Sequence, residues 1–255
     1  MIKEVIKANG SVEKFDLDKL SKWAKYATKV GGDWSEIAIE TFTKLPEQTD
    51  SKDIHQAMID VCYAKQDLVY SRVAARLETA QLRKNIERKF GIQVNKCSFK
   101  EIRKALLDNG VWCKETIPKY SEKQEQLFEE LKQVDLESWQ ISQWSDKYLL
   151  KFEDVVVETP VIAAIGIGLG LHGDGQDAYD LASDIVNSRT NLPTPVLNGI
   201  RNGDFNGVSC CVISAGDSVE SIEVAQHLAV RMTAKKAGIG IEFTTRSKGS
   251  DVKNG

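Results

Sequence analysis

The first ninety residues pass from strand-like to helix-like spacing of their apolar positions. Strand-forming residues at 2–6 and 12–15 flank Asn9-Gly10, a dipeptide that favours a tight hairpin turn. The chain is therefore predicted to begin as a β-hairpin. Beyond it, apolar residues recur every three or four positions, which predicts four amphipathic helices that start near residues 17, 34, 51 and 70.

Polar residues and helix breakers indicate where these helices begin and end. Asp16 is the expected N-cap of the first helix and Ser51 that of the third, because short oxygen-bearing side chains accept hydrogen bonds from free first-turn amides. Gly31-Gly32 and Pro46 are expected to end the first and second helices. Cys62 falls on the apolar face of the third helix, as expected of a core residue.

The middle of the chain is predicted to be helical, with one β-prone interruption. A helical run covers Phe99–Leu107, and residues 121–150 predict one or two polar helices. From residue 147 the chain becomes β-prone, and Pro160 then opens a strongly apolar helix, Val161–Leu171. A further helix is expected over Ala178–Ser188.

Residues 191–217 combine rigid turns with a pair of thiols. In Pro193-Thr194-Pro195 the prolines fix the backbone around the threonine, so its hydroxyl can be held in place. A Gly/Asn-rich loop leads to an apolar run headed by Ser209-Cys210-Cys211. A thiol at the start of a strand is both reachable and positioned, although free cysteine more commonly acts as a small buried hydrophobe. Asp217 is the expected N-cap of the next helix, and residues 237–241 are expected to form a buried strand.

Composition restricts the class of protein. The 255 residues carry a formal net charge of −3, which argues against a broad nucleic-acid surface but permits a local basic pocket. The five cysteines include no C-x-x-C pair and there are three histidines, so no zinc site is expected. Unpaired cysteines, the lack of a leader and an apolar run too short for a bilayer predict a cytoplasmic protein without a membrane partner.

Several short motifs occur in a characteristic order: Leu192-Pro193-Thr194-Pro195, an arginine in the loop, Ser209-Cys210, Gly216-Asp217-Ser218 and Ala237-Gly238-Ile239-Gly240. In this order they resemble the large (alpha) subunit of class I ribonucleotide reductase. The resemblance implies that Cys210 is one of two thiols that supply reducing electrons. Cys211 would take this role if the register slips by one, since the family usually has an apolar residue at that place. The resemblance also implies substrate contacts by Thr194, Ser209, Cys210, Ala237 and Gly238, and an allosteric specificity site at Asp217, Ser218 and Arg246.

The N-terminal hairpin and four helices resemble the ATP-cone, a regulatory nucleotide-binding module of many ribonucleotide reductases. By this resemblance, ATP or dATP would be held by Lys7, Glu13, Lys14, Phe15, Asp16, Leu17, Asp18, Lys19, Ser51 and Lys84. The chemistry is coherent, because ammonium groups supply point charges for a triphosphate and turn amides add donors. No G-x-x-x-x-G-K-[ST] sequence occurs, so this site would not be a P-loop.

Together these features predict an α/β chain, α+β overall. Residues 1–90 would form the ATP-cone, residues 91–150 a helical connection, and residues 151–255 the first part of a ten-stranded α/β barrel that is left incomplete. The family's radical-bearing cysteine and its second reducing cysteine match no stretch of the chain. We therefore expect a second polypeptide to complete the subunit, as in a split gene, in preference to a truncated chain.

The resemblance implies reduction of ribonucleoside diphosphates to deoxyribonucleoside diphosphates by radical chemistry, for DNA precursor synthesis. A small (beta) subunit with a di-metal centre would supply the radical, deoxynucleoside triphosphates would act as effectors, and thioredoxin or glutaredoxin would be the reductant. This chain would itself hold no metal and bind no DNA or RNA, and the completed subunit would form a homo-oligomer. Two other functions stay open: a nucleotide sensor without catalysis, and a thiol redox protein built on Cys210-Cys211. The strained ring of a disulfide between adjacent cysteines argues against the latter.

Overall fold

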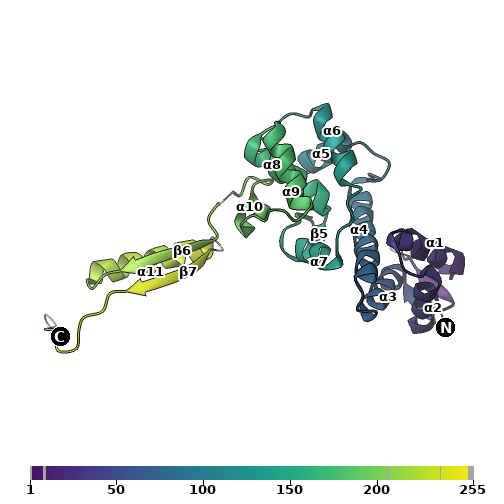
Figure 1. Ribbon diagram of the computed structural model, residues 1–255, viewed down its shortest axis with the longest axis horizontal. Coiled ribbons are helices and arrows are strands. Elements are labelled where there is room, and N and C mark those ends of the chain that lie inside the picture. The colour runs from purple at the N-terminus through teal and green to yellow at the C-terminus, as the bar shows by residue number, and fades with distance from the viewer. Residues whose placement is uncertain (1, 8–9, 206, 236, 252–255) are drawn as a thin grey trace.

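The computed structural model describes residues 2–7, 10–205, 207–235 and 237–251, which form a mostly helical protein with small sheets (Figure 1). We refer to residues 2–90 as the N-terminal unit. Its elements are β1 (Glu4–Ile6), β2 (Val12–Lys14), α1 (Leu17–Ala27), the 3-10 helix η1 (Thr28–Val30), α2 (Trp34–Lys44), β3 (Gln48–Asp50), α3 (Ser51–Ala64) and α4 (Leu68–Phe90).

The predicted β-hairpin is confirmed, because β1 runs antiparallel to β2 with Val5 opposite Glu13. Gly10 has a φ of 81°, a left-handed conformation that favours glycine, and the turn residues Ala8 and Asn9 lie outside the described residues. The sequence did not reveal β3, which pairs parallel to β1 and gives the strand order β2-β1-β3. Its three residues are mostly polar and too few to show a strand's alternation.

The four helices predicted for the N-terminal unit are present, but one cap differs. Asp16 caps α1 as predicted, accepting hydrogen bonds from the amides of Asp18 at 2.9 Å and Lys19 at 3.4 Å. The prediction of Ser51 as an N-cap is wrong. Because β3 runs directly into α3, the extended residue Asp50 holds the N-cap position and Ser51 is the first helical residue. The apolar faces of α1–α4 enclose a separate core that includes Leu20, Ile37, Met58, Cys62 and Leu77.

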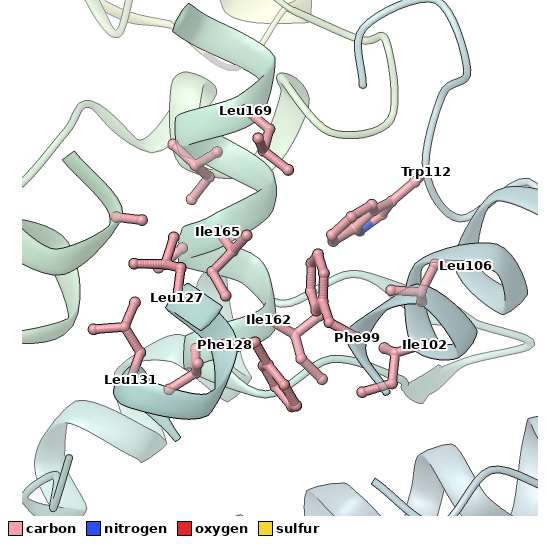
Figure 2. Packing of buried hydrophobic residues seen from close by; sticks show 14 of the residues in the cluster. Phe99, Ile102, Leu106, Trp112, Leu127, Phe128, Leu131, Ile162, Ile165 and Leu169 are labelled. Atoms are coloured by element: carbon pink, nitrogen blue, oxygen red, sulfur yellow. The ribbon is translucent and has the colours of Figure 1, made fainter. Parts of the chain in front are cut away.

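A second group of elements forms what we call the helical body. It consists of α5 (Phe99–Asp108), α6 (Glu122–Leu131), α7 (Ser138–Lys147), β4 (Lys151–Phe152), β5 (Val155–Val156), α8 (Pro160–His172), α9 (Gln176–Val186) and α10 (Thr194–Gly199). As predicted, α8 is apolar and starts at Pro160, and most of its length is buried. Figure 2 shows Ile162 and Ile165 of α8 beside Phe99 and Phe128, which belong to α5 and α6.

Helix α4 connects the N-terminal unit to the helical body (Figure 1). Its first half contributes Leu77 to the N-terminal core, while Leu82 and Ile86 in its second half pack against the helical body. Two ion pairs add to this junction: Arg72 with Glu137 at 2.8 Å and Arg76 with Asp135 at 3.0 Å. A single helix therefore belongs to both cores.

The C-terminal βαβ unit consists of β6 (Cys210–Ala215), α11 (Val219–Ala234) and β7 (Gly238–Phe243), and in Figure 1 it extends away from the helical body. The two strands are parallel, with Cys210 opposite Gly238. Several apolar side chains of this unit are exposed: Val212 by 80%, Val230 by 70% and Phe243 by 60%. The barrel stays a prediction, because within the described residues this sheet contains two strands.

Two expectations for this unit are wrong. Ser218, and not Asp217, is the N-cap of α11, and its Oγ accepts a hydrogen bond from the Ser221 amide at 3.2 Å. The strand predicted at residues 237–241 is present as β7 but is largely exposed, because one face of the two-stranded sheet is left uncovered. Among the described residues, every helix is too short or too polar to span a bilayer.

Candidate functional site

A pocket of about 140 Å³ opens between the N-terminal sheet and helices α1, α3 and α4. Eight of the ten residues predicted to hold adenine nucleotide line it: Lys7, Glu13, Lys14, Phe15, Asp16, Lys19, Ser51 and Lys84. The other two, Leu17 and Asp18, lie in the first turn of α1, are exposed and do not line the pocket. Residues separated by up to 77 positions in the sequence are therefore brought to one concave surface.

Glu13 organises the open side of this pocket, which we call the cone pocket. Its carboxylate lies 3.1 Å from the Lys7 ammonium and 3.3 Å from that of Lys19. The hydrogen bonds from Lys7 and Lys19 lower the pKa of Glu13, so it is ionised at neutral pH. Four lysines and two carboxylates line the pocket, which leaves an excess of positive charge for an anionic ligand.

Lys84 and His55 form the inner wall of the cone pocket. Burial lowers the pKa of Lys84, whose ammonium lies 4.0 Å from the centre of the Trp23 ring. The Nε2 of His55 lies 2.7 Å from the Leu77 carbonyl oxygen, so this nitrogen carries the proton and donates. Burial also lowers the pKa of His55, which keeps its ring neutral. Trp23 and His55 were not among the residues predicted to line a nucleotide site. Their positions in α1 and α3 indicate only that each lies on the buried face of its helix.

The start of β6 brings together most of the residues predicted to contact substrate. Cys210 is exposed, and the hydroxyl of Ser209 lies 3.8 Å from its sulfur. The carbonyl of Ser209 accepts a hydrogen bond from the Gly238 amide at 2.7 Å, which places Ala237 and Gly238 beside the thiol. Cys211, the next residue along the strand, is partly buried. Cys210 is therefore the more accessible of the two thiols.

Thr194 lies at a different place. It is the first residue of α10 and lines a cavity of about 460 Å³ with Asn198, Phe205 and Lys235 among others. Cys210 does not line this cavity, so the structure does not join the two predicted substrate-binding groups in one pocket. The end of α11 also reaches this cavity, since Ala234 and Lys235 line it shortly before Ala237 in the sequence.

The three residues predicted for the specificity site meet at the far end of the βαβ unit. The Nε of Arg246 donates to the Asp217 carboxylate at 2.5 Å, while the neighbouring Ser218 caps α11. Both charged side chains are partly exposed, Arg246 by 38% and Asp217 by 46%. The guanidinium therefore already has a carboxylate partner. Its Nη1 donates to the Asp251 carbonyl at 3.3 Å and its Nη2 to the Asp217 carbonyl at 3.5 Å.

Comparisons with known proteins extend over almost the whole chain, although no family model matches it. The alpha subunit of ribonucleoside-diphosphate reductase from Enterobacteria phage T4 is 29% identical over 271 aligned positions. Subunit alpha of ribonucleoside-diphosphate reductase 1 from Escherichia coli (strain K12) is 25% identical over 281 positions, and both alignments cover 98% of this chain. This chain is a homologue of the ribonucleoside-diphosphate reductase alpha subunit. It spans 35% of the length of these two relatives, as expected of an N-terminal portion, so the resemblance inferred from the motifs is confirmed.

One buried ion pair in this reductase homologue was not foreseen. Arg201 and Glu158 are fully buried, and the guanidinium binds both carboxylate oxygens at 2.9 Å. Arg201 also donates to the carbonyls of Tyr148 and Leu197, and the indole of Trp112 donates to Glu158 at 2.6 Å. The pair therefore anchors the segment after Thr194 to the start of α8. The sequence showed an arginine in the loop but not its partner, which lies 43 positions away.

The part of the chain that the structure describes shows no metal-binding site. No group of three or more His, Cys, Asp or Glu side chains there is arranged to hold an ion. The described thiols are free and mutually unpaired. The candidate chemistry of this chain is thus concentrated in the cone pocket and in the accessible thiol of Cys210.

Proposed function

We propose that this chain forms the N-terminal part of a catalytic alpha subunit that reduces ribonucleoside diphosphates to deoxyribonucleoside diphosphates. The observation that carries the proposal is the alignment of 98% of the chain with ribonucleoside-diphosphate reductase alpha subunits. The position of Cys210 supports the proposal. Its thiol is exposed at the start of β6, next to Ser209 and opposite Gly238 of β7, where a bound substrate could reach it.

In this proposal Cys210 is one of two reducing thiols. The ribose 2′-hydroxyl leaves as water and is replaced by hydrogen, and the two electrons and two protons come from Cys210 and a second thiol, which end as a disulfide. A radical from a separate beta subunit with a di-metal centre starts the reaction, and thioredoxin or glutaredoxin reduces the disulfide again. A complementary polypeptide would carry the radical-bearing cysteine and the second thiol.

Two effector sites would regulate the completed subunit. The cone pocket would bind ATP or dATP, with Lys7, Lys19 and Lys84 on the phosphates. Asp217, Ser218 and Arg246 would contribute to a site for deoxynucleoside triphosphates, where Arg246 can exchange its carboxylate partner for a phosphate. Residues 1–90 would be the ATP-cone, residues 91–150 the helical connection and residues 151–255 the beginning of the barrel. In this division α8, α9 and α10 of the helical body would already belong to the barrel.

The decisive experiment replaces Cys210 by serine in the completed enzyme. We expect Cys210→Ser to abolish dithiol-dependent turnover and to leave ATP binding by the cone pocket unchanged. The matched control is Cys211→Ser, which should retain most of the turnover. Loss of turnover in the control alone would assign the reducing role to Cys211 instead.

A nucleotide sensor without catalysis is the second candidate function. It is favoured by one observation: the cone pocket is complete within residues 5–84, a unit with its own core. ATP binding by this chain, weakened about tenfold or more by Lys84→Gln, is expected under either function because one charge-assisted contact is lost. Lys44→Gln, an exposed lysine outside the pocket, is the control. Full binding without any turnover after addition of the complementary and beta subunits would favour the sensor.

A further inference from the structure

A separate basic cavity lies where the N-terminal unit meets the helical body. Its volume is about 390 Å³, and none of the residues that line the cone pocket lines it. One wall consists of Tyr26 on α1 with Arg76 and Arg83 on α4. The opposite wall comes from the end of α6 at Lys132, the segment that leads to α7, and the start of α8 at Pro160.

Two guanidinium groups converge on this junction cavity. Arg76 and Arg83 are seven residues apart on α4, so they project from the same face two turns apart. Both contact Tyr26: the guanidinium carbon of Arg76 lies 4.9 Å from the ring centre, and Arg83 donates to the hydroxyl at 3.4 Å. Burial lowers the pKa of Arg83, and the charge of Arg76 lowers it further.

The positive charge of the junction cavity is incompletely matched. Arg76 has a carboxylate partner in Asp135 at 3.0 Å, and Lys132 has one in Glu129. Arg83 forms no ion pair with any described residue, and the buried Nε atoms of Arg76 and Arg83 make no hydrogen bond to a described protein atom. A partly buried guanidinium without a counter-charge is costly, so the arrangement favours an anion that brings its own oxygens.

We propose that the junction cavity binds a small organic oxyanion, a carboxylate or a phosphate monoester on an apolar body, with its head between Arg76 and Arg83. The planar guanidinium fork suits both kinds of head group. Phe128, Val134 and Leu136 supply apolar lining for the body of the ligand, and the volume lies in the range of small-molecule sites. Because its walls come from both regions, a bound ligand holds the N-terminal unit against the helical body.

The test is calorimetric titration of the chain in phosphate-free buffer with phenyl phosphate and, separately, with benzoate. The two titrations distinguish a phosphate from a carboxylate ligand, and binding of either supports the proposal. We expect Arg83→Gln to weaken binding about tenfold or more, because a charge-assisted contact is lost. Arg88→Gln, an exposed arginine on the same helix, should bind as the unchanged chain does.

Two further variants keep the test decisive. Lys7→Gln alters the cone pocket alone and should leave binding unchanged, whereas lost binding there would overturn the proposal by placing the ligand in the cone pocket. If Arg83→Gln fails to fold by circular dichroism, Arg76→Gln provides the same comparison with Arg88→Gln. Three other results would also overturn the proposal. Arg83→Gln and Arg88→Gln could bind with equal affinity, phenol could bind as tightly as phenyl phosphate, or neither oxyanion could bind.

Discussion

The two ends of this chain differ in how far they bury their apolar residues. The N-terminal unit encloses Leu20, Ile37 and Leu77 in a core of its own. The C-terminal βαβ unit buries little beyond Ile213, Ala215 and Ala225 and leaves Val212 and Val230 in solvent. An exposed apolar surface of this kind is typical of a region that packs against something else. The helical body between them contains the largest cluster of buried apolar side chains. The predictions below compare these environments.

The largest expected effect is in the helical body. Arg201→Met leaves the buried carboxylate of Glu158 without its counter-charge, which should lower the free energy of unfolding by about 3–5 kcal/mol. Urea denaturation followed by tryptophan fluorescence measures this. The double variant Glu158→Gln/Arg201→Met should recover part of the loss, because no unpaired charge then remains. An undiminished loss in the double variant would show that packing, and not charge, causes it.

The next effect compares two glycines, one in each kind of environment. A Cβ added at Gly168 in α8 would lie 2.3 Å from the carbonyl oxygen of Ala178, so Gly168→Ala must separate α8 from α9. We expect a loss of about 1–3 kcal/mol in unfolding free energy. At Gly240 in β7 the nearest atom would be 3.8 Å from the added Cβ, so Gly240→Ala should cause no steric loss of unfolding free energy. Equal losses in urea denaturation would contradict the contrast in packing.

Sequence patterns predicted the N-terminal unit better than the C-terminal one for a physical reason. The helices of the N-terminal unit bury the same apolar face that defines their periodicity, so the helix positions could be inferred from spacing. The eight residues that line the cone pocket were instead implied by the resemblance to the ATP-cone. The short strand β3 carries no such pattern, and its presence moved the N-cap of α3 from Ser51 to Asp50.

Partners distant in sequence could not be inferred in this way. The apolar residues of β7 predicted a buried strand, but burial depends on what covers the sheet, and β7 is largely exposed. Likewise, the motif containing Arg201 indicated its presence but not its pairing with Glu158, and the separation of Thr194 from Cys210 depends on how α10 and the βαβ unit are placed. Patterns indicate which face is apolar, whereas tertiary packing decides which partner it meets.

A smaller effect distinguishes the two units by pH. Burial lowers the pKa of His55 in the folded N-terminal unit, so below about pH 6.5, the ordinary histidine value, the unfolded chain takes up a proton that the folded chain does not. The part of the stability that depends on a neutral His55 is therefore fully present above about pH 6.5 and is lost as pH falls below that value. For one proton the slope is at most about 1.4 kcal/mol per pH unit.

Two histidine variants isolate this effect. His55→Gln keeps a donor for the Leu77 carbonyl and should reduce the dependence of unfolding free energy on pH between 7 and 5. His227→Gln, in the exposed face of α11, should leave that dependence unchanged. If both variants follow the pH profile of the unchanged chain, His55 is not the source of the pH dependence and other titrating groups dominate it.

The smallest expected effect tests whether the exposed surface of the βαβ unit stabilises the isolated chain at all. Val230 on α11 is 70% exposed, so Val230→Gln should change unfolding free energy by no more than about 0.5 kcal/mol. Ala225 is 3% exposed between α11 and the sheet, so Ala225→Gln is the destabilising control. Amide hydrogen exchange of β6 separates this unit from the rest of the chain. Faster exchange in both variants would show that Val230 is covered in solution, and sedimentation velocity would then show whether a second copy covers it.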